Sequence, residues 1–342
     1  MTPLDIGIAF DLRSNFTVPV DSPIDALEEY DTQSTVDALL EALTAIGHCP
    51  RVLGSGREFL ERMVTSPPQL VFNIAEGWGT RSREAQVPAV CEMLGVPYTH
   101  SDPLTQALSL DKALAKRVVQ SAGVCTAPFQ LVDSAARAEA AAAALLWPVF
   151  VKPAAEGSSM GVRVTSRVAD REALTQEVQR CLTAYKQPVL VESYLPGVEV
   201  TVGVCGSGDR ARVMGTMEIA PAGGAVADFV YGLESKRNYR ELVRYHAPPC
   251  SLSAAQIADA ERTALAAHRV LGCRDIARVD VRFDGEGRAN FIEVNPLPGL
   301  NPETGDLVVM TRLLGGQYED VIGTILTEAL SRYPELSAAA VC

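Results

Sequence analysis

The chain has 342 residues, a formal net charge of -12 and a 47% share of hydrophobic residues. These values are typical of a globular protein of two or three domains, and the negative charge argues against a surface for nucleic acid or membranes. The sequence contains neither a signal-peptide pattern nor a membrane-spanning apolar run, and its eight cysteines form no C-x-x-C pair. We therefore expect a cytoplasmic protein with reduced cysteines.

Residues 1–101 alternate short apolar runs with helical patterns. The apolar runs predict strands at residues 6–10, 51–53, 70–74 and 96–98. Helices are predicted at residues 35–45 and 84–94, and each is followed by a glycine, Gly47 or Gly95, that is typical of a helix end. This alternation predicts a parallel α/β domain whose binding groups gather at the carboxyl ends of the strands.

Two further lobes are predicted after the turn Ser101-Asp102-Pro103. Residues 102–187 form the central lobe, with helices to about residue 123, strands at 129–132, 149–153 and 162–165, and helices at 134–146 and 171–185. Residues 188–342 form the C-terminal lobe, with strands, a polar loop at 221–246 and a helix at 253–271 that begins with Ser253 as its N-cap. The predicted fold class is an N-terminal α/β domain followed by two α+β lobes.

The stretch from residue 278 to 300 predicts an antiparallel β-hairpin, because two alternating runs flank the turn Asp284-Gly285-Glu286-Gly287. On the first strand, Val279, Val281 and Phe283 share one face. On the second, Ile292 and Val294 are expected to share one face, and Glu293 and Asn295 the other.

A register with Asp280 across from Glu293 sets two carboxylates side by side. Like charges directly opposite each other destabilise a sheet, so a positive group is expected between them. A divalent cation with oxygen ligands from Asp280, Glu293 and Asn295 meets this need. The alternative is a solvated hairpin face that carries scattered charges.

A lysine and a glycine/serine loop form a second candidate site. Lys152 ends a short apolar strand, and the loop Glu156-Gly157-Ser158-Ser159-Met160-Gly161 follows it. Glycines let such a loop fold closely over a ligand, and its N–H and hydroxyl groups suit phosphate oxygens. A buried ammonium group also needs an anion. The alternative for this loop is an ordinary hairpin connection.

Two glutamates, Glu192 and Glu199, bracket residues 193–198 between apolar strands. A nucleoside site requires a carboxylate for the ribose hydroxyls and backbone groups of a linker for the adenine edge. The alternative is an ordinary connector with exposed acidic side chains.

The order of these motifs resembles the ATP-grasp superfamily, and specifically the D-alanine–D-alanine ligase family. The similarity extends with good spacing from Val71 to the end of the chain and is weaker before it. Its strongest pieces are Tyr98-Thr99-x-Ser101 through Leu108-Ser109-Leu110-Asp111-Lys112, Val151-Lys152-Pro153 with the loop at 156–161, and Arg278-Val279-Asp280 with Glu293-Val294-Asn295-Pro296-Leu297-Pro298-Gly299. The resemblance implies that the two lobes clamp ATP.

The resemblance also implies a role for each matched residue. ATP would be bound by Lys112, Lys152, Ser158, Ser159, Glu192, Tyr194, Leu195, Glu199 and Lys236. Two Mg²⁺ ions, for which Mn²⁺ is a substitute, would be bound by Asp280, Glu293 and Asn295. The catalytic residues would be Arg278 and Gly299 at the oxyanion, with Ser158 and Lys236 in mobile loops that close over the phosphates.

Four departures from the family's pattern fall in the substrate pockets. The glutamate that holds the first substrate's ammonium group aligns with Glu28, with Glu29 as its near rival. Glu76 replaces a histidine of the family and Arg237 replaces a tyrosine. Thr304 stands where the family has the serine that binds the second substrate's carboxylate. The candidate substrate-binding residues are Glu28, Glu76, Arg81, Arg237 and Thr304.

These observations predict an ATP- and Mg-dependent carboxylate–amine ligase that acts through an acylphosphate and releases ADP and phosphate. It would join small amino acids, or an amino acid and a small metabolite. The alternatives are a true D-alanine–D-alanine ligase of peptidoglycan synthesis and a non-catalytic ATP-binding regulatory module. The expected partners are small-molecule substrates, neither nucleic acid nor membrane, with a homodimer as a further option.

Overall fold

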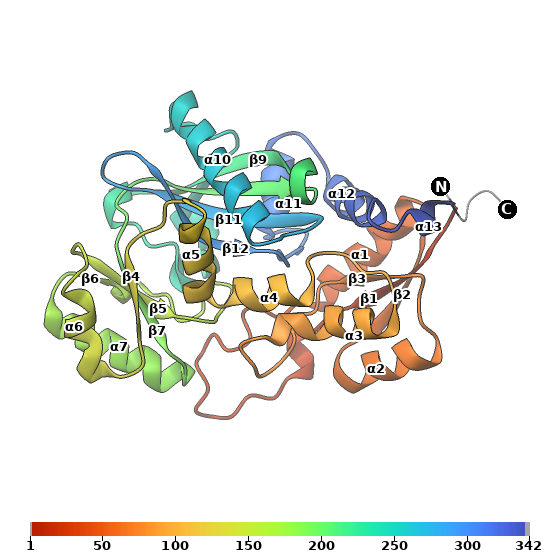
Figure 1. The fold of residues 1–342 in the computed structure, drawn as a ribbon, viewed down its shortest axis with the longest axis horizontal. Coiled ribbons are helices and arrows are strands. Elements are labelled where there is room, and N and C mark those ends of the chain that lie inside the picture. The colour runs from red at the N-terminus through yellow and green to blue at the C-terminus, as the bar shows by residue number, and fades with distance from the viewer. Residues whose placement is uncertain (1, 339–342) are drawn as a thin grey trace.

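The computed structural model describes residues 2–338, whose strands form three separate sheets (Figure 1). One sheet is parallel and two are antiparallel. This arrangement confirms the predicted order of an α/β domain followed by two lobes.

The N-terminal domain has a parallel sheet with the strand order β2-β1-β3. Its elements are β1 (Asp5–Ala9), α1 (Gln33–Ala45), β2 (Cys49–Gly54), α2 (Gly56–Thr65), β3 (Leu70–Asn73) and α3 (Gln86–Leu94). The strand predicted at residues 96–98 is wrong, because only an isolated bridge between Val71 and Tyr98 forms there. Pro97 has no N–H group to donate to a ladder. Helix α2 was not predicted.

The central lobe has an antiparallel sheet with the order β4-β7-β5-β6. Its elements are β4 (Phe129–Val132), α6 (Ala138–Ala142), β5 (Val149–Pro153), β6 (Arg167–Val168), α7 (Arg171–Tyr185) and β7 (Val189–Ser193). The strand predicted at residues 162–165 is wrong. The backbone N–H of Arg163 donates to the hydroxyl of Ser166 at 3.0 Å, and this local bond closes a turn in place of a ladder.

The expected boundary between residues 187 and 188 separates β7 from its own sheet. Strand β7 pairs with both β4 and β5, so we assign it to the central lobe. The helices α4 (Pro103–Leu110) and α5 (Lys112–Ser121) precede that lobe, and Ala115 and Val119 of α5 are buried in the core of the C-terminal lobe. The boundaries between the lobes are therefore defined by which sheet or core a segment joins, and a single cut point in the sequence does not describe them.

The C-terminal lobe has a five-stranded antiparallel sheet with the order β10-β9-β8-β11-β12. Its strands are β8 (Glu199–Cys205), β9 (Arg212–Pro221), β10 (Val243–His246), β11 (Ile276–Phe283) and β12 (Ala289–Asn295). Its helices are α8 (Leu233–Arg237), α9 (Tyr239–Leu242), α10 (Ala254–Val270), α11 (Asp306–Leu313), α12 (Tyr318–Leu330) and α13 (Pro334–Ala338). Ser253 caps α10, as predicted, by accepting a hydrogen bond from the N–H of Gln256.

The predicted hairpin is confirmed as β11 and β12, with Asp280 directly opposite Glu293. One detail is wrong, because Ile292 does not share a face with Val294. The register shifts after Asp280, so Ile292 is an extra residue in a β-bulge, which locally reverses the alternation. Ile292 is therefore partly exposed in the smaller cavity, whereas Val294 is 3% exposed and belongs to the core.

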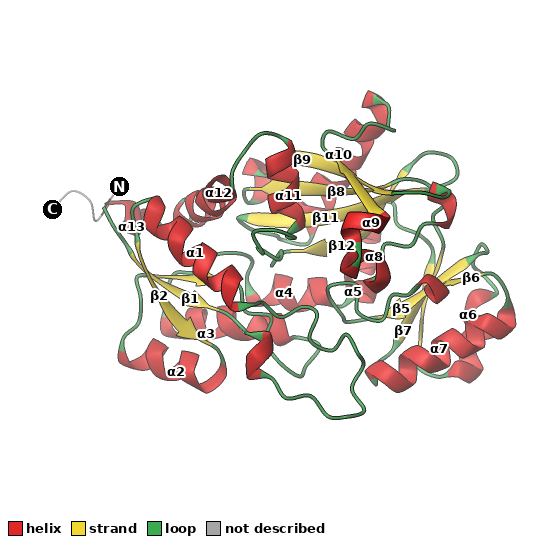
Figure 2. Cartoon of the chain, turned by 180° about the vertical axis from the view of Figure 1, so that it is seen from behind, coloured by secondary structure: helices red, strands yellow, loops and turns green. Residues whose placement is uncertain are grey.

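The hydrophobic cores connect segments that are far apart in the sequence. Leu39 and Leu43 of α1 share one core with Ile322 and Ile325 of α12, so the N-terminal domain packs against the C-terminal lobe. Figure 2 shows α1 and α12 close together. The central lobe has a separate core between its sheet and its two helices.

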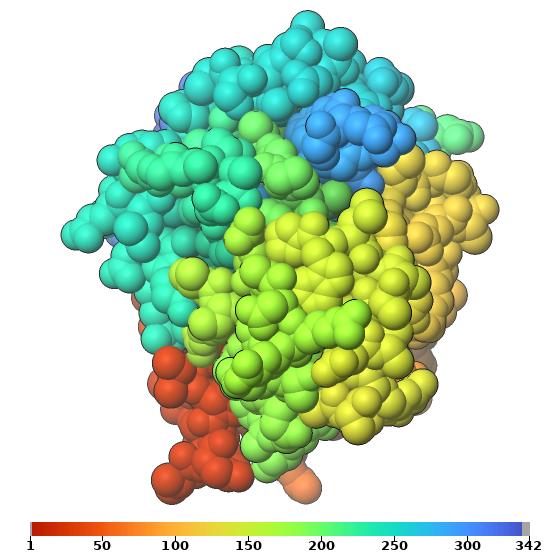
Figure 3. Space-filling model, turned by 90° about the vertical axis from the view of Figure 1, so that its left-hand side faces the viewer, coloured from red at the N-terminus to blue at the C-terminus, as the bar shows by residue number. Residues whose placement is uncertain are grey.

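The segment between β1 and α1 lies against the central lobe, where Figure 3 shows it in red at the lower edge. Asp25 in this segment accepts hydrogen bonds from the N–H of Gly161 at 3.0 Å and from the hydroxyl of Tyr185 at 2.7 Å. It also forms an ion pair of 3.1 Å with Arg163. The segment is therefore held to the glycine/serine loop.

Among residues 2–338, no helix combines the length and the apolar character needed to cross a membrane. The seven cysteines in this part of the chain are free, and Cys342 lies outside it.

Candidate active site

Two adjoining cavities lie where the domain and the two lobes meet. Their volumes are about 360 Å³ and 90 Å³. Both are lined by Lys112, Glu156, Tyr231, Lys236, Arg278 and Glu293. Because these residues are shared, the two cavities form one site with a larger and a smaller compartment.

The hairpin carboxylates are held by positive side chains. Asp280 accepts hydrogen bonds from Thr201 Oγ1 at 2.7 Å and from Arg278 Nη2 at 3.0 Å. Glu293 forms an ion pair of 3.0 Å with Lys112. Burial raises the pKa of Asp280, whereas for Glu293 the charges of Lys112, Lys152 and Arg278 outweigh burial and lower the pKa. The expected positive charge beside the two carboxylates is therefore supplied by protein side chains.

The donor set of the hairpin fits a hard divalent cation. Asp280, Glu293 and Asn295 can each offer an oxygen atom, and the Nδ2 of Asn295 donates to Asp280 at 3.4 Å, which places the amide beside the carboxylate. No group of three His, Cys, Asp or Glu side chains spaced for a metal occurs within residues 2–338. A metal at the hairpin would therefore need the amide oxygen of Asn295 as its third protein ligand. With only three protein donors, the rest of an octahedral shell would come from water and phosphate oxygens.

Arg278 is the centre of the charge network. Its guanidinium contacts Asp280 at 3.0 Å, Asp306 at 2.8 Å and Glu293 at 3.9 Å. Burial opposes its charge, but the surrounding carboxylates raise its pKa above the ordinary value. Arg278 therefore remains a fixed cation at the junction of the two compartments.

A pair of buried lysines shares one carboxylate in the smaller compartment. Lys116 and Lys152 each lie 2.8 Å from Glu192, and both are almost fully buried. Burial opposes ionisation of Glu192, yet the two ammonium groups lower its pKa to about 2. The cluster carries one surplus positive charge, which suits an incoming phosphate.

Glu199 and Tyr194 are joined by an arginine that the sequence analysis did not single out. Arg282 lies 3.0 Å from Glu199, and its Nη2 donates to the hydroxyl of Tyr194 at 2.6 Å. Burial raises the pKa of Glu199, and the charge of Arg282 opposes this effect. Leu195, Phe150, Met160, Val162 and Ile292 provide apolar surface in the same compartment. This combination fits a purine and a ribose.

The two predicted loops meet over the site. Ser158 and Ser159 are consecutive residues with positive φ angles of 46° and 58°, a conformation that is uncommon for residues other than glycine. The hydroxyl of Ser159 donates to the carbonyl of Tyr231 at 3.3 Å, and the N–H of Leu233 donates to the carbonyl of Val162 at 3.1 Å. Both loops therefore lie in a closed arrangement.

Lys236 extends from the second loop into the site. Its ammonium group lies 5.4 Å from the centre of the Tyr231 ring and has no ion pair within residues 2–338. Burial and the charge of Arg278 lower its pKa. An unpaired cation next to Arg278 is available to an anionic ligand.

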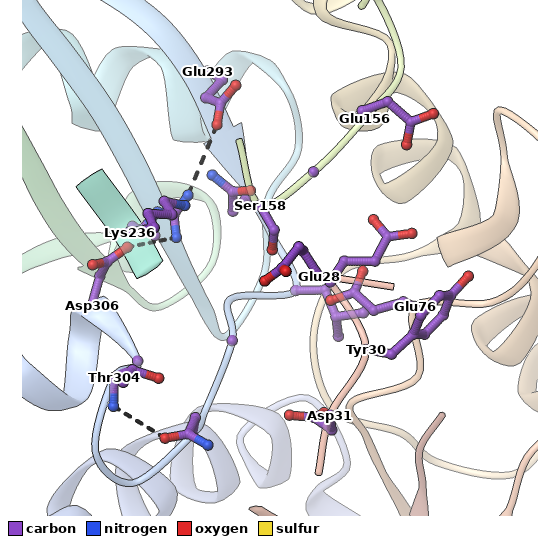
Figure 4. Close-up of a pocket in the computed structure, with 18 of the residues that line it drawn as sticks. Glu28, Tyr30, Asp31, Glu76, Glu156, Ser158, Lys236, Glu293, Thr304 and Asp306 are labelled. Carbon is purple, nitrogen blue, oxygen red and sulfur yellow. Dashed lines mark hydrogen bonds and ion pairs between the residues drawn. The ribbon is translucent and has the colours of Figure 1, made fainter. Parts of the chain in front are cut away.

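Four of the five candidate substrate residues line the larger compartment. Figure 4 shows Glu28 and Glu76 across the pocket from Lys236 and Thr304. Arg81 lies elsewhere, because its side chain is 75% exposed and faces Asp111 outside both compartments. Gly299 lines the larger compartment.

The choice between Glu28 and Glu29 can be examined through their partners. Arg237 Nε donates to Glu28 at 3.1 Å, and Arg13 lies 3.7 Å from the same carboxylate. Arg83 donates to both oxygens of Glu29, at 2.9 Å and 2.7 Å. Glu28 is therefore the one that contacts the loop carrying Lys236.

Several polar and charged residues that line the site were given no role in the sequence analysis. Lys116 lies one helical turn after Lys112, and Arg282 lies two residues after Asp280 on the same strand. Each therefore shares a face with a predicted site residue, and this spacing could have placed both in the site. Asp306 and Glu84 have no such signal, because they enter the site from separate elements. These residues are Lys116, Arg282, Asp306, Glu84 and Ser109.

An antiparallel central lobe and an antiparallel C-terminal lobe that enclose a lysine-rich cleft define an ATP-grasp protein. A solved structure of D-alanine–D-alanine ligase from Bacillus anthracis complexed with ATP superposes with a TM-score of 0.70, covers 97% of this chain and 99% of that chain, and is 17% identical. This likeness supports the fold.

Sequence comparisons define the family. The family model "D-ala D-ala ligase C-terminus" matches residues 118–327. D-alanine–D-alanine ligase from Synechococcus sp. (strain JA-3-3Ab) is 35% identical over 74% of this chain and 75% of its own length. The enzyme of that name from Sinorhizobium fredii (strain NBRC 101917 / NGR234) is 32% identical over 85% of this chain and 90% of its own length. The chain belongs to the D-alanine–D-alanine ligase family and is an ATP-dependent ligase that forms C–N bonds.

Proposed function

We propose that this ligase joins two small amino acids through an acylphosphate and that D-alanine is the amino acid at both positions. The observation that carries the proposal is the position of Arg278 and the unpaired Lys236 between a lysine-rich cleft and a cavity of about 360 Å³. D-alanine appears in the names of the curated relatives, and this favours it over the broader range of substrates that the pocket departures indicated. Membership of a ligase family argues against a non-catalytic regulatory module.

The nucleotide would lie in the smaller compartment. Lys112, Lys152, Ser158, Ser159 and Lys236 would hold its phosphates, and Glu192, Tyr194, Leu195 and Glu199 would hold its base and ribose. Mg²⁺ held by Asp280, Glu293 and Asn295 would supply the positive charge that stabilises a transferring phosphoryl group.

In the first step, the carboxylate of one amino acid attacks the γ-phosphate, the bond to ADP breaks, and an acylphosphate forms. Lys236 is the cation best suited to the phosphoryl oxygens, because it has no carboxylate partner to give up. The two loops at residues 154–161 and 221–246 exclude water, which would otherwise hydrolyse the acylphosphate.

In the second step, the amine of the other amino acid attacks the acyl carbon and phosphate leaves. Arg278 and the backbone N–H near Gly299 would stabilise the oxyanion. Asp306 and Asp280 fix the guanidinium from two sides, so its orientation is set before the substrate arrives.

The proposal is tested by incubating the protein with Mg²⁺, ATP and D-alanine. We expect ADP release that depends on D-alanine, with D-alanyl-D-alanine identified by mass spectrometry. A panel of D- and L-amino acids that produces no ADP above the protein-free rate would overturn the proposed chemistry.

A further inference from the structure

The larger compartment contains several carboxylates, and their partners differ. Glu28 is compensated by Arg237 and Arg13, and Glu29 is compensated by Arg83. Glu76 and Glu84 line the same compartment and have neither a hydrogen bond nor an ion pair within residues 2–338. Asp31 also lines the compartment without an ion pair in this part of the chain, but the hydroxyl of Thr35 lies beside its carboxyl group and lowers its pKa against the larger effect of burial. Among the described residues, the carboxyl groups left without any such neighbour are those of Glu76 and Glu84.

Burial makes these two side chains costly to ionise. Glu84 is only 8% exposed, and it lines the cavity. Burial is the main cause that raises the pKa of Glu84 to about 7 and that of Glu76 well above its ordinary value. The charge of Glu29 adds to both shifts, and Glu84 also raises the pKa of Glu76. A buried carboxylate is stable when a cation pairs with it.

A third group points to the same ligand. The hydroxyl of Ser109 on α4 is 3% exposed, lines the same compartment and has no hydrogen-bond partner. Helix α4 packs against the turn that carries Glu84. Buried polar atoms are almost always hydrogen-bonded, so the unpartnered hydroxyl of a residue that lines the cavity indicates a partner that the protein does not supply.

The three acceptors match one chemical group. An ammonium group has three N–H donors and no acceptor. Two carboxylates and one hydroxyl offer one acceptor for each donor. Glu28 is a poorer acceptor for an ammonium group, because a second cation there would have to displace Arg237, which donates to it through Nε at 3.1 Å.

We propose that Glu76, Glu84 and Ser109 form the subsite for the ammonium group of the amino acid whose carboxylate is activated. This inference rests on the proposed function and assigns to these residues the recognition that the sequence comparison gave to Glu28. The activated substrate is then a free amino acid, and hydroxy acids and N-acylated amino acids are rejected. Lys236, which has no ion pair within the described residues, lies across the pocket from Glu76, so the site offers a group of opposite charge to each end of a zwitterion (Figure 4).

The test compares two probes that differ only in the ammonium group. D-alanine and propionate are titrated calorimetrically into the full-length protein saturated with Mg²⁺ and a non-hydrolysable ATP analogue. The measured quantity is the ratio of the two dissociation constants. The wild-type protein is expected to prefer D-alanine, and the double variant E76Q/E84Q is expected to lose that preference by about 30-fold or more.

Three further variants make the test specific. E28Q is expected to keep the wild-type ratio of the two dissociation constants, because Glu28 is paired with Arg237 and does not contact the ammonium group in this proposal. E41Q removes one negative charge from an exposed position on α1 and controls for net charge. S109A is expected to lower the ratio less than E76Q/E84Q does. Thermal unfolding without ligand adds a second readout, since E84Q removes an unpaired buried acid and is expected to raise the melting temperature at pH 8.

The results separate this inference from the proposed function. Loss of the preference in E76Q/E84Q supports the subsite. The subsite is overturned if E28Q alone loses the preference, or if the wild-type protein does not prefer D-alanine to propionate. ADP release by the wild-type protein with the amino-acid panel reports on the ligase chemistry independently of this ratio.

Discussion

Arg237 on helix α8 binds Glu28, a residue 209 positions earlier in the chain, with Nε at 3.1 Å from the carboxylate. The same guanidinium donates to the carbonyl of Ile24 at 3.1 Å. These bonds connect the loop that carries Lys236 to the segment between β1 and α1. Side chains from the N-terminal domain and from the C-terminal lobe thereby meet beside the substrate cavity.

Replacing Arg237 by alanine should admit water to the acylphosphate. The pair is partly exposed, and such pairs contribute up to about 1 kcal/mol, so we expect the ratio of phosphate released to peptide formed to rise about fivefold. The measurement is parallel assay of phosphate and peptide. R240A is the matched control, since Arg240 lies on the neighbouring helix and is 78% exposed. Equal ratios in both variants would contradict a closing role for Arg237.

Replacing Arg278 by lysine should slow turnover far more than it weakens nucleotide binding. Lysine keeps the positive charge among Asp280, Glu293 and Asp306 but loses the planar guanidinium that contacts them together. We expect kcat to fall by about 10²- to 10³-fold, the effect of losing one oxyanion donor. Turnover is followed by ADP release and nucleotide affinity by fluorescence titration. An unchanged kcat in this variant would show that Arg278 does not stabilise the oxyanion.

Replacing Glu192 by glutamine should destabilise the protein even without substrate. Lys116 and Lys152 would then be buried without their shared carboxylate, and breaking a buried ion pair costs about 3–5 kcal/mol. The free energy of unfolding is measured by urea denaturation, with E41Q as an exposed control. If the free energy of unfolding changes no more than in E41Q, then Lys116 and Lys152 do not depend on Glu192 and are solvated by water instead.

Removing divalent metal should stop turnover. The oxygen donors of Asp280, Glu293 and Asn295 suit Mg²⁺, and we expect Mn²⁺ to restore activity after chelation. E293Q should require a higher Mg²⁺ concentration for half-maximal ADP release while D-alanine binding to the metal-free protein changes little. Full activity in excess chelator would exclude a metal at the hairpin.

Glu84 predicts how stability depends on pH. Its folded-state pKa is raised to about 7 from 4.5, so between these values the folded protein holds a proton that the unfolded chain has lost. The free energy of unfolding therefore falls as pH rises from 4.5 to about 7, by up to about 1.4 kcal/mol per pH unit from this group. Urea denaturation across this range should give a smaller decrease for E84Q than for the wild-type protein. Parallel curves for the two proteins would contradict the shift.

The hairpin was predictable because its information is local. Alternation with period two and a turn of the sequence Asp284-Gly285-Glu286-Gly287 predict the two strands and their antiparallel pairing as far as Val281 and Phe291. The bulge at Ile292, which places Glu293 rather than Ile292 opposite Asp280, is not encoded in the turn or in the alternation. Local patterns also predicted α7 and the cap of α10.

The charges of the substrate pocket were only partly predictable. Glu28 and Glu76 were singled out because they align with substrate residues of relatives. The sequence pattern does not indicate which of the carboxylates is paired with an arginine in the folded protein. The pairing of Glu29 with Arg83 spans 54 residues, and that of Arg282 with Glu199 spans 83. Such pairs depend on the folded arrangement of whole domains. A homodimer and a cytoplasmic location stay predictions.

The separate core of the central lobe has a mechanical consequence. Helices α1 and α12 bind the N-terminal domain and the C-terminal lobe into one rigid body, whereas the central lobe joins that body through only two chain crossings, at residues 122–128 and 194–198. A hinge at these crossings lets the central lobe rotate without breaking any core. Outward rotation of this lobe would open the nucleotide compartment and would also withdraw Glu156, Gly157 and Ser158 from the wall of the larger compartment.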